Sequence, residues 1–174
     1  MARTTYPPGE LRILRVAWTV AASVWPLAAF LGLLTLAALA WWARSGDSGL
    51  VLLALLCGKT GMLGLVASFA LHESAHAAVL KTRPGITAIT VEATAWRISL
   101  IPEGTLTRGE NALVALAGPL ACAAVGAGLW LTGIDRLLAW WYLLHLAFLL
   151  PVFGDGQALW RSFRGARAAP HPHP

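Results

Sequence analysis

The sequence predicts an all-α integral membrane protein with four transmembrane helices and a short β-hairpin-like insert between the second and third. Of its 174 residues, 57% are hydrophobic, 12% are charged and nine are tryptophan. The apolar residues form four long runs, each exceeding the roughly 20 residues that a helix needs to cross a bilayer. A chain of this length predicts roughly one domain, so we expect a single membrane domain over residues 1–174.

The first two runs cover residues 16–42 and 49–80. The first is much longer than the roughly 7 to 15 apolar residues of a secretory signal, so we expect an uncleaved anchor. The second is longer than one crossing needs, and two glycines flank Lys59 within it. We expect its crossing to cover residues 60–80, with the preceding residues at the outer surface or in an overlong, tilted helix.

The insert follows the second run and occupies residues 86–104, which are rich in β-branched side chains. This composition favours strands, and we expect a short hairpin that is cytoplasmic or re-entrant. The third run covers residues 112–132 and the fourth covers residues 137–160. The fourth contains Pro151 and two glycines around Asp155, which should break the helix and leave a loop.

The basic residues predict the orientation. With the N-terminus in the cytoplasm and four crossings, ten of the thirteen lysines and arginines fall in cytoplasmic segments. We therefore expect a multi-pass protein of the cytoplasmic membrane with both termini inside, and a disordered tail at residues 165–174. The basic residues are scattered beside apolar runs, which argues for the lipid bilayer and against nucleic acid as a partner. The outer interface should be marked by five tryptophans, namely Trp41, Trp42, Trp130, Trp140 and Trp141.

A His-Glu-x-x-His sequence lies inside the second run, with His72, Glu73 and His76 as its defined positions. Ionisable side chains within a transmembrane segment are unfavourable in hydrocarbon and therefore indicate a function. Positions i and i+4 share one face of a helix, so the two imidazoles can bind one zinc ion. Glu73 can then reach toward the water on that ion.

Asp155 is the predicted third ligand, because zinc in a hydrolase usually has three protein ligands and a water. The helix break in the fourth run would let its loop bend toward the metal. At about 1.5 Å per residue, His72 lies roughly 13 Å from Lys81, and Asp155 roughly 9 Å from Arg161, so both fall in the same half of the bilayer. If Asp155 is not the ligand, the candidates are Glu92, Glu103 and Glu110.

Over about residues 63–160 the chain resembles the site-2 protease family of intramembrane zinc metalloproteases. The resemblance rests on the His-Glu-x-x-His sequence, the strand-like insert, the Ala-Gly-Pro of residues 117–119, and the Asp-Gly that begins at Asp155. It implies peptide-bond hydrolysis in a membrane-embedded protein substrate, with one zinc ion per chain. It also implies that the zinc ligands are His72, His76 and Asp155 and that the general base is Glu73.

The expected function is therefore an intramembrane zinc endopeptidase that cuts near the cytoplasmic leaflet. A helical substrate hides its carbonyl groups in internal hydrogen bonds and must unwind, and an exposed edge within residues 86–101 could hold it as an added strand. Two other functions remain open. The first is a non-proteolytic membrane scaffold or binding protein, which is suggested because Cys122 stands where the family commonly has asparagine. A CAAX-type membrane protease, with a glutamate ligand in place of Asp155, is the other.

Several other polar residues have structural interpretations. His145 lies in the fourth run, about 15 Å along a helix from the predicted ligand there, and is interpreted as a satisfied or interfacial histidine. Residues 118–119 are interpreted as a kink that permits close helix packing. Lys59 is expected to extend its side chain to the outer interface. Cys57 and Cys122 are interpreted as buried thiols.

Overall fold

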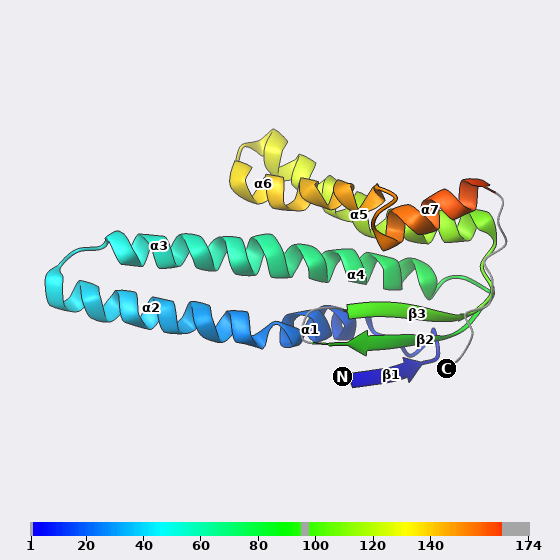
Figure 1. Cartoon of the computed structure of the whole chain (residues 1–174), viewed down its shortest axis with the longest axis horizontal. Coiled ribbons are helices and arrows are strands. Elements are labelled where there is room, and N and C mark those ends of the chain that lie inside the picture. The colour runs from blue at the N-terminus through cyan, green and yellow to red at the C-terminus, as the bar shows by residue number, and fades with distance from the viewer. Residues whose placement is uncertain (1, 95–97, 165–174) are drawn as a thin grey trace.

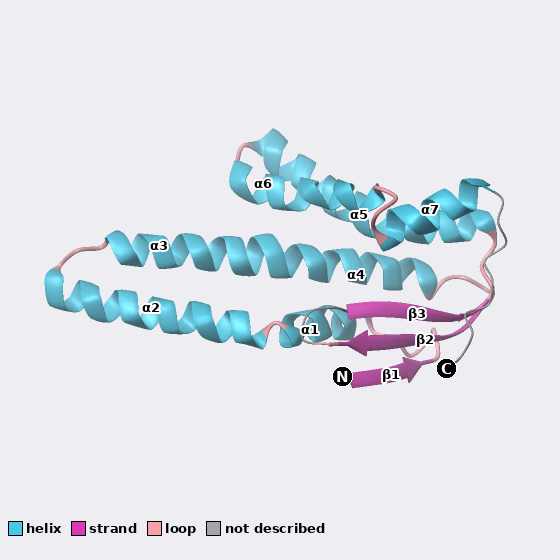
Figure 2. Ribbon diagram, in the orientation of Figure 1, coloured by secondary structure: helices cyan, strands magenta, loops and turns pink. Residues whose placement is uncertain are grey.

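The computed structural model of the chain describes residues 2–94 and 98–164 (Figure 1). Most of the structure is helical, and a three-stranded antiparallel sheet lies at one end of the bundle (Figure 2). Within these described residues, three helices are long and apolar enough to cross a membrane, and a bent pair makes a fourth candidate. The predicted fold class is therefore confirmed. The tail at residues 165–174 lies outside the described residues.

In chain order the elements are β1 (Ala2–Tyr6), α1 (Ile13–Ser23), α2 (Trp25–Ser45), α3 (Gly49–Gly58), a π-helical segment (Lys59–Val66), α4 (Ala67–Leu80), β2 (Ile86–Ala93), β3 (Ile98–Gly104), α5 (Arg108–Thr132), α6 (Arg136–Leu143), a 3₁₀ segment (Leu144–Leu149) and α7 (Gly154–Arg164).

The first apolar run forms two helices instead of the one that was predicted. α1 ends at Ser23, and α2 begins at Trp25 with Pro26 in its first turn. Proline has no backbone N–H to donate to the preceding turn, so it starts a helix readily but does not continue one. Only α2, with 21 residues, is long enough to be a candidate span. The shorter α1 packs against α4.

The second run forms one continuous helical stretch of 32 residues, from Gly49 to Leu80. The glycines around Lys59 do not end it; they lie where α3 passes into the π-helical segment. Lys59 Nζ donates a hydrogen bond of 2.8 Å to Asp135 Oδ2, and this bond lowers the pKa of Asp135 below its usual value. Lys59 therefore has a specific partner at the N-terminus of α6, which the sequence did not predict.

The Lys59 contact shows which part of the α2–α3 hairpin lies beyond the rest of the bundle. Because Lys59 is level with the start of α6, the ten residues of α3, about 15 Å of helix, extend past the turn between α5 and α6. Figure 1 shows this projection. Trp41 and Trp42 lie near the far end of α2, whereas Trp130 and Trp140 make an edge-to-face contact beside the α5–α6 turn, with ring centres 5.3 Å apart. The five tryptophans predicted to mark the outer interface therefore do not lie at one level.

The sheet has the order β1-β2-β3. The predicted hairpin is present as β2 and β3, but the N-terminal strand β1 was not foreseen. It pairs antiparallel with β2, and side chains reinforce the pairing: Thr5 Oγ1 lies 2.7 Å from Thr90 Oγ1, and Arg3 Nε lies 3.3 Å from Glu92 Oε1. β2 is consequently the central strand, and β3 is the edge strand next to α4 (Figure 1).

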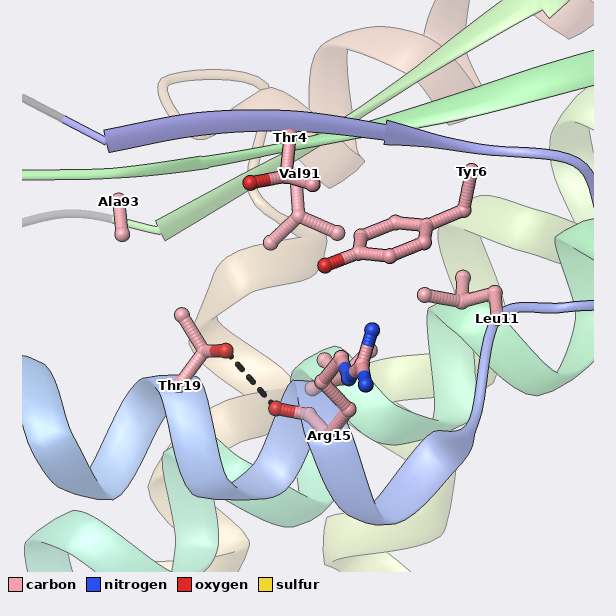
Figure 3. Close-up of a pocket in the computed structure, with 8 residues that line it drawn as sticks. Thr4, Tyr6, Leu11, Arg15, Thr19, Val91 and Ala93 are labelled. Atoms are coloured by element: carbon pink, nitrogen blue, oxygen red, sulfur yellow. Dashed lines mark hydrogen bonds between the residues drawn. The ribbon is translucent and has the colours of Figure 1, made fainter.

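One face of the sheet packs against α1 and α4. The apolar cluster between them consists of Leu11, Val16, Ala77, Leu80, Ile86, Ile89 and Val91. A small cavity of about 50 Å³ lies beside this cluster. Figure 3 shows Tyr6 on its sheet side and Arg15 on α1. The Arg15 guanidinium lies 5.3 Å from the centre of the Tyr6 ring, a cation–π distance. This packing fixes the C-terminal half of α4.

The fourth run is broken, as predicted. α6 and the 3₁₀ segment end before Leu150, and α7 starts at Gly154 after a bend of about 40°. Gly156 lies in the first turn of α7, and a Cβ there would overlap the Leu150 carbonyl group. Glycine is therefore required where the chain turns back on itself. The bend places the first turn of α7 beside α5, against which α7 packs.

Candidate metal centre

Two histidines of α4 face α5 at a position where α5 has no side chain. His72 and His76 are one helical turn apart, and their exposed fractions are only 3% and 7%. A Cβ on Gly118 of α5 would lie 2.5 Å from His76 Nε2 and 2.8 Å from His72 Nε2. Real Cβ atoms do not approach that closely, so glycine at this position lets the backbone of α5 lie against both imidazoles. The interpretation of Gly118 as a close-packing residue agrees with this contact.

Replacing Gly118 by Ala is therefore expected to displace both imidazoles and to weaken metal binding by at least about tenfold, the low end of the range for groups that support metal ligands. Gly128 is the matched control on the same helix, because a Cβ there would meet nothing within 4 Å. Competition with a fluorescent zinc chelator measures both variants. Equal affinity in Gly118→Ala and wild type would contradict the role of this contact.

Asp155 completes the group from the first turn of α7. Its Oδ2 lies 3.0 Å from His72 Nε2, and its Oδ1 lies 3.4 Å from His76 Nε2. The two Nε2 atoms are themselves 3.0 Å apart. Ligand atoms about 2.0–2.1 Å from a tetrahedral zinc ion would be about 3.3 Å from one another. The three side chains therefore already have nearly the separations that a metal ion requires.

Hydrogen bonding fixes the orientation of the His76 ring. Its Nδ1 lies 2.7 Å from the carbonyl oxygen of Val114 on α5. A carbonyl oxygen can only accept, so Nδ1 carries a proton, and in the neutral ring the lone pair is then on Nε2, which faces the group. Metal-binding histidines commonly have such a partner on the second ring nitrogen. α5 thus supplies both the space for the imidazoles and the group that orients one of them.

Asn111 is a positioning residue that the sequence reasoning missed. Its Nδ2 donates to the Ala158 carbonyl oxygen at 3.0 Å and lies 2.8 Å from Ser162 Oγ, and both partners are on α7. These bonds tie α7 to α5 next to the turn that carries Asp155. The available signal was an amide side chain at the start of an apolar run, since such groups commonly join transmembrane helices.

His145 lies beside His72, which the count of residues along the fourth run did not predict. The two ring centres are 5.2 Å apart, and Phe148 lies 5.2 Å from His72 as well. The estimate of about 15 Å assumed one straight helix, whereas the chain breaks and bends between His145 and Asp155. His72 is therefore enclosed by aromatic rings from the fourth run.

Glu73 follows His72 on α4, is partly buried, and lies near enough to His76 for its charge to act on that imidazole. The three glutamates considered as alternative ligands have other partners. Glu92 pairs with Arg3, Glu103 Oε1 accepts a hydrogen bond from Thr90, and Glu110 forms a capping box with Thr107. Of the predicted site residues, the structure thus brings His72, His76 and Asp155 together, with Glu73 beside them.

The arrangement can hold a metal ion. Two imidazole nitrogens and a carboxylate oxygen, all within 4.8 Å of one another, converge inside the bundle. The Asp155 side chain is 22% exposed, compared with 4% and 9% for those of His72 and His76, so the group is most accessible from the α7 side. No protein-family model, curated protein or solved structure matches this chain.

Proposed function

We propose that this chain is an intramembrane zinc endopeptidase. The observation that carries the proposal is the convergence of His72, His76 and Asp155 on one point, beside Glu73, inside a bundle of apolar helices. The first two come from α4, and Asp155 comes from α7, 83 residues away in the sequence from His72. A His-Glu-x-x-His sequence alone is common enough to mislead. Its meeting with a distant carboxylate is a much more specific feature.

The donor set favours zinc as the ion. Two histidines and one carboxylate are a ligand set of catalytic zinc sites, which keep one position open for water or substrate. A zinc ion held there would polarise the scissile carbonyl group and lower the pKa of bound water to about 7. His72, His76 and Asp155 would hold this single ion, and the Val114 carbonyl group would keep His76 in the binding tautomer.

Glu73 is the proposed general base. It accepts the proton of the attacking water and delivers it to the nitrogen of the leaving amine, so the carboxylate is regenerated when the peptide bond has been cleaved. Its place beside His72 in the sequence, one turn or less from both imidazoles, supports this role. The nearby carboxylate of Asp155 is occupied by the imidazoles and is less suited to proton transfer.

The sheet offers a way to present the substrate. β2 is paired on both sides, so the edge expected within residues 86–101 is that of β3, at Ile98–Gly104. β3 lies next to α4, the helix that carries the proposed base and two of the ligands. A substrate segment that unwinds can hydrogen-bond to β3 as a fourth strand, which exposes its backbone carbonyl groups.

The proposed location is the cytoplasmic membrane, with both termini in the cytoplasm and cleavage near the cytoplasmic leaflet. His76 is four residues before Leu80, where α4 ends, and Lys81 and Arg83 follow within the next three residues. Basic residues concentrate on the cytoplasmic side of membrane proteins, which supports this orientation. The membrane-embedded protein substrate would then meet the site within about two helical turns of the cytoplasmic surface.

The test is cleavage by the purified chain in liposomes, using a panel of transmembrane-segment peptides and one isoprenylated C-terminal peptide. We expect cleavage within a transmembrane segment, its loss with a zinc chelator, and its return on adding zinc. Bound zinc with no cleavage of any peptide would instead support the non-proteolytic scaffold. Cleavage of the isoprenylated peptide alone would support a CAAX-type protease.

A further inference from the structure

A second group of potential metal ligands meets at His72. One ligand atom from each of His72, Cys122 and His145 lies within 4.8 Å of the other two. All three residues are at least 97% buried, with exposed fractions of 3%, 0% and 3%. The proposed peptidase mechanism uses neither Cys122 nor His145. These two residues therefore need a separate explanation.

Helix packing brings Cys122 to this point. It lies one turn after Gly118 and so is on the same face of α5, opposite the α4 face that carries His72. Its Sγ donates to the carbonyl oxygen of Ser68 at 3.2 Å, and Ser68 is one turn before His72. The thiol therefore lies against the same face of α4 that carries the imidazoles. Cys57, the other cysteine of the chain, is at the end of α3 and belongs to no such group among the described residues.

Two buried nitrogens in this group have no hydrogen-bond partner among the described residues. His145 Nδ1 lies 3.1 Å from the Trp141 carbonyl oxygen and therefore carries the proton, which leaves the lone pair on Nε2. That Nε2 is buried and unpartnered, and so is Nδ1 of His72. Burying such an atom without a hydrogen-bond partner is unfavourable, because it loses its interaction with water and gains none in return. A bound cation would satisfy a nitrogen lone pair directly.

We propose that His72, Cys122 and His145 form a second metal-binding group, selective for thiophilic cations such as Zn²⁺ or Cu⁺. A thiolate with two imidazoles is a ligand set that such ions prefer. On binding, the Cys122 thiol loses its proton to solvent and the sulfur coordinates the ion. Trigonal coordination, with about 2.3 Å to sulfur and about 2.0–2.1 Å to nitrogen, requires ligand separations of about 3.5–3.8 Å. The side chains therefore need to close by about 1 Å.

The shared histidine makes the two groups compete. A neutral imidazole has one lone pair, so His72 can serve the ion beside Asp155 or the ion beside Cys122, but not both at once. Weakening the group that contains Asp155 should therefore transfer the ion to the group that contains Cys122. This second group does not depend on peptide hydrolysis, and it can be tested on protein with no known substrate.

The test uses Co²⁺ as the probe and absorption spectroscopy as the readout, because a cobalt–thiolate bond has an intense near-ultraviolet charge-transfer band. The starting variant is Asp155→Ala, in which His72 no longer has the Asp155 carboxylate as a partner. We expect this full-length variant to show the band with Co²⁺. Adding Cys122→Ser should abolish the band, and adding Cys57→Ser should leave it unchanged.

The result that would overturn the second group is the absence of the band in both Asp155→Ala and the nearly isosteric Asp155→Asn, each checked by circular dichroism for wild-type helix content. A band that survives Cys122→Ser would also overturn it. If the second metal-binding group is overturned, the expected zinc content and peptide cleavage of the wild-type chain do not change. A failure of the peptidase proposal likewise leaves the cobalt spectrum of these variants unchanged.

Discussion

Replacing Glu73 by Gln is expected to lower peptide cleavage by about 10²–10⁴-fold, the usual contribution of a general acid–base group, while zinc stays bound. Glutamine keeps the size of the side chain but cannot accept a proton from water. None of the three proposed ligands is altered, so the metal content should remain that of the wild type. Cleavage is measured on the peptide identified from the panel, and zinc by elemental analysis of the same sample.

Glu10→Gln is the matched control for this experiment. Glu10 is exposed in the connection between β1 and α1 and should tolerate the same change with no loss of cleavage. Cleavage by Glu73→Gln at the wild-type rate would exclude Glu73 as the base. Loss of zinc from Glu73→Gln would show instead that this carboxylate supports the metal site.

Replacing Asp155 by Ala is the second change with a large expected effect. It removes one of three proposed ligands, so zinc affinity should fall by more than the roughly 10–100-fold typical of a lost supporting group. Because Cys122 is proposed to bind zinc with His72 when Asp155 is absent, the comparison is made in a Cys122→Ser background. At a chelator-buffered zinc concentration that fills Cys122→Ser, the double variant should be nearly empty.

Asp47→Asn in the same Cys122→Ser background is the control. Asp47 lies in the loop between α2 and α3, where its Oδ1 accepts a hydrogen bond from the backbone N–H of Gly49. Asparagine keeps that acceptor, and we expect full zinc occupancy. If the Asp155 double variant binds as much zinc as this control, the third ligand must be another group, and the three glutamates considered from the sequence become the first to test.

Local patterns accounted for the parts of the fold that depend on neighbours in the chain. The length of the apolar runs predicted the long helices, the β-branched residues predicted the strands β2 and β3, and Pro151 with its glycines predicted the bent fourth span. Each of these signals acts within a few residues, through hydrogen-bonding capacity, side-chain sterics or burial. The predictions based on whole runs were less exact, since Pro26 divided one run into α1 and α2.

The candidate site also has parts that the local sequence predicts and parts that depend on helix packing. The spacing of His72 and His76 placed both imidazoles on one helical face, and the break in the fourth run made Asp155 available to them. The sequence could not show that Gly118 admits the imidazoles or that Asn111 ties α7 to α5. Both depend on which helices become neighbours and on how closely their backbones approach, which packing of the whole bundle decides.

The sequence by itself determined a helical membrane architecture, a strand-forming insert and a candidate zinc motif with a predicted third ligand, because apolar length and i, i+4 spacing act locally. Only the tertiary structure decided that the N-terminal residues form β1, that the α2–α3 hairpin projects past the α5–α6 turn, and that His145 and Cys122 meet at His72. These features join segments far apart in the chain. Their free energy comes from contacts that exist only after the bundle has formed.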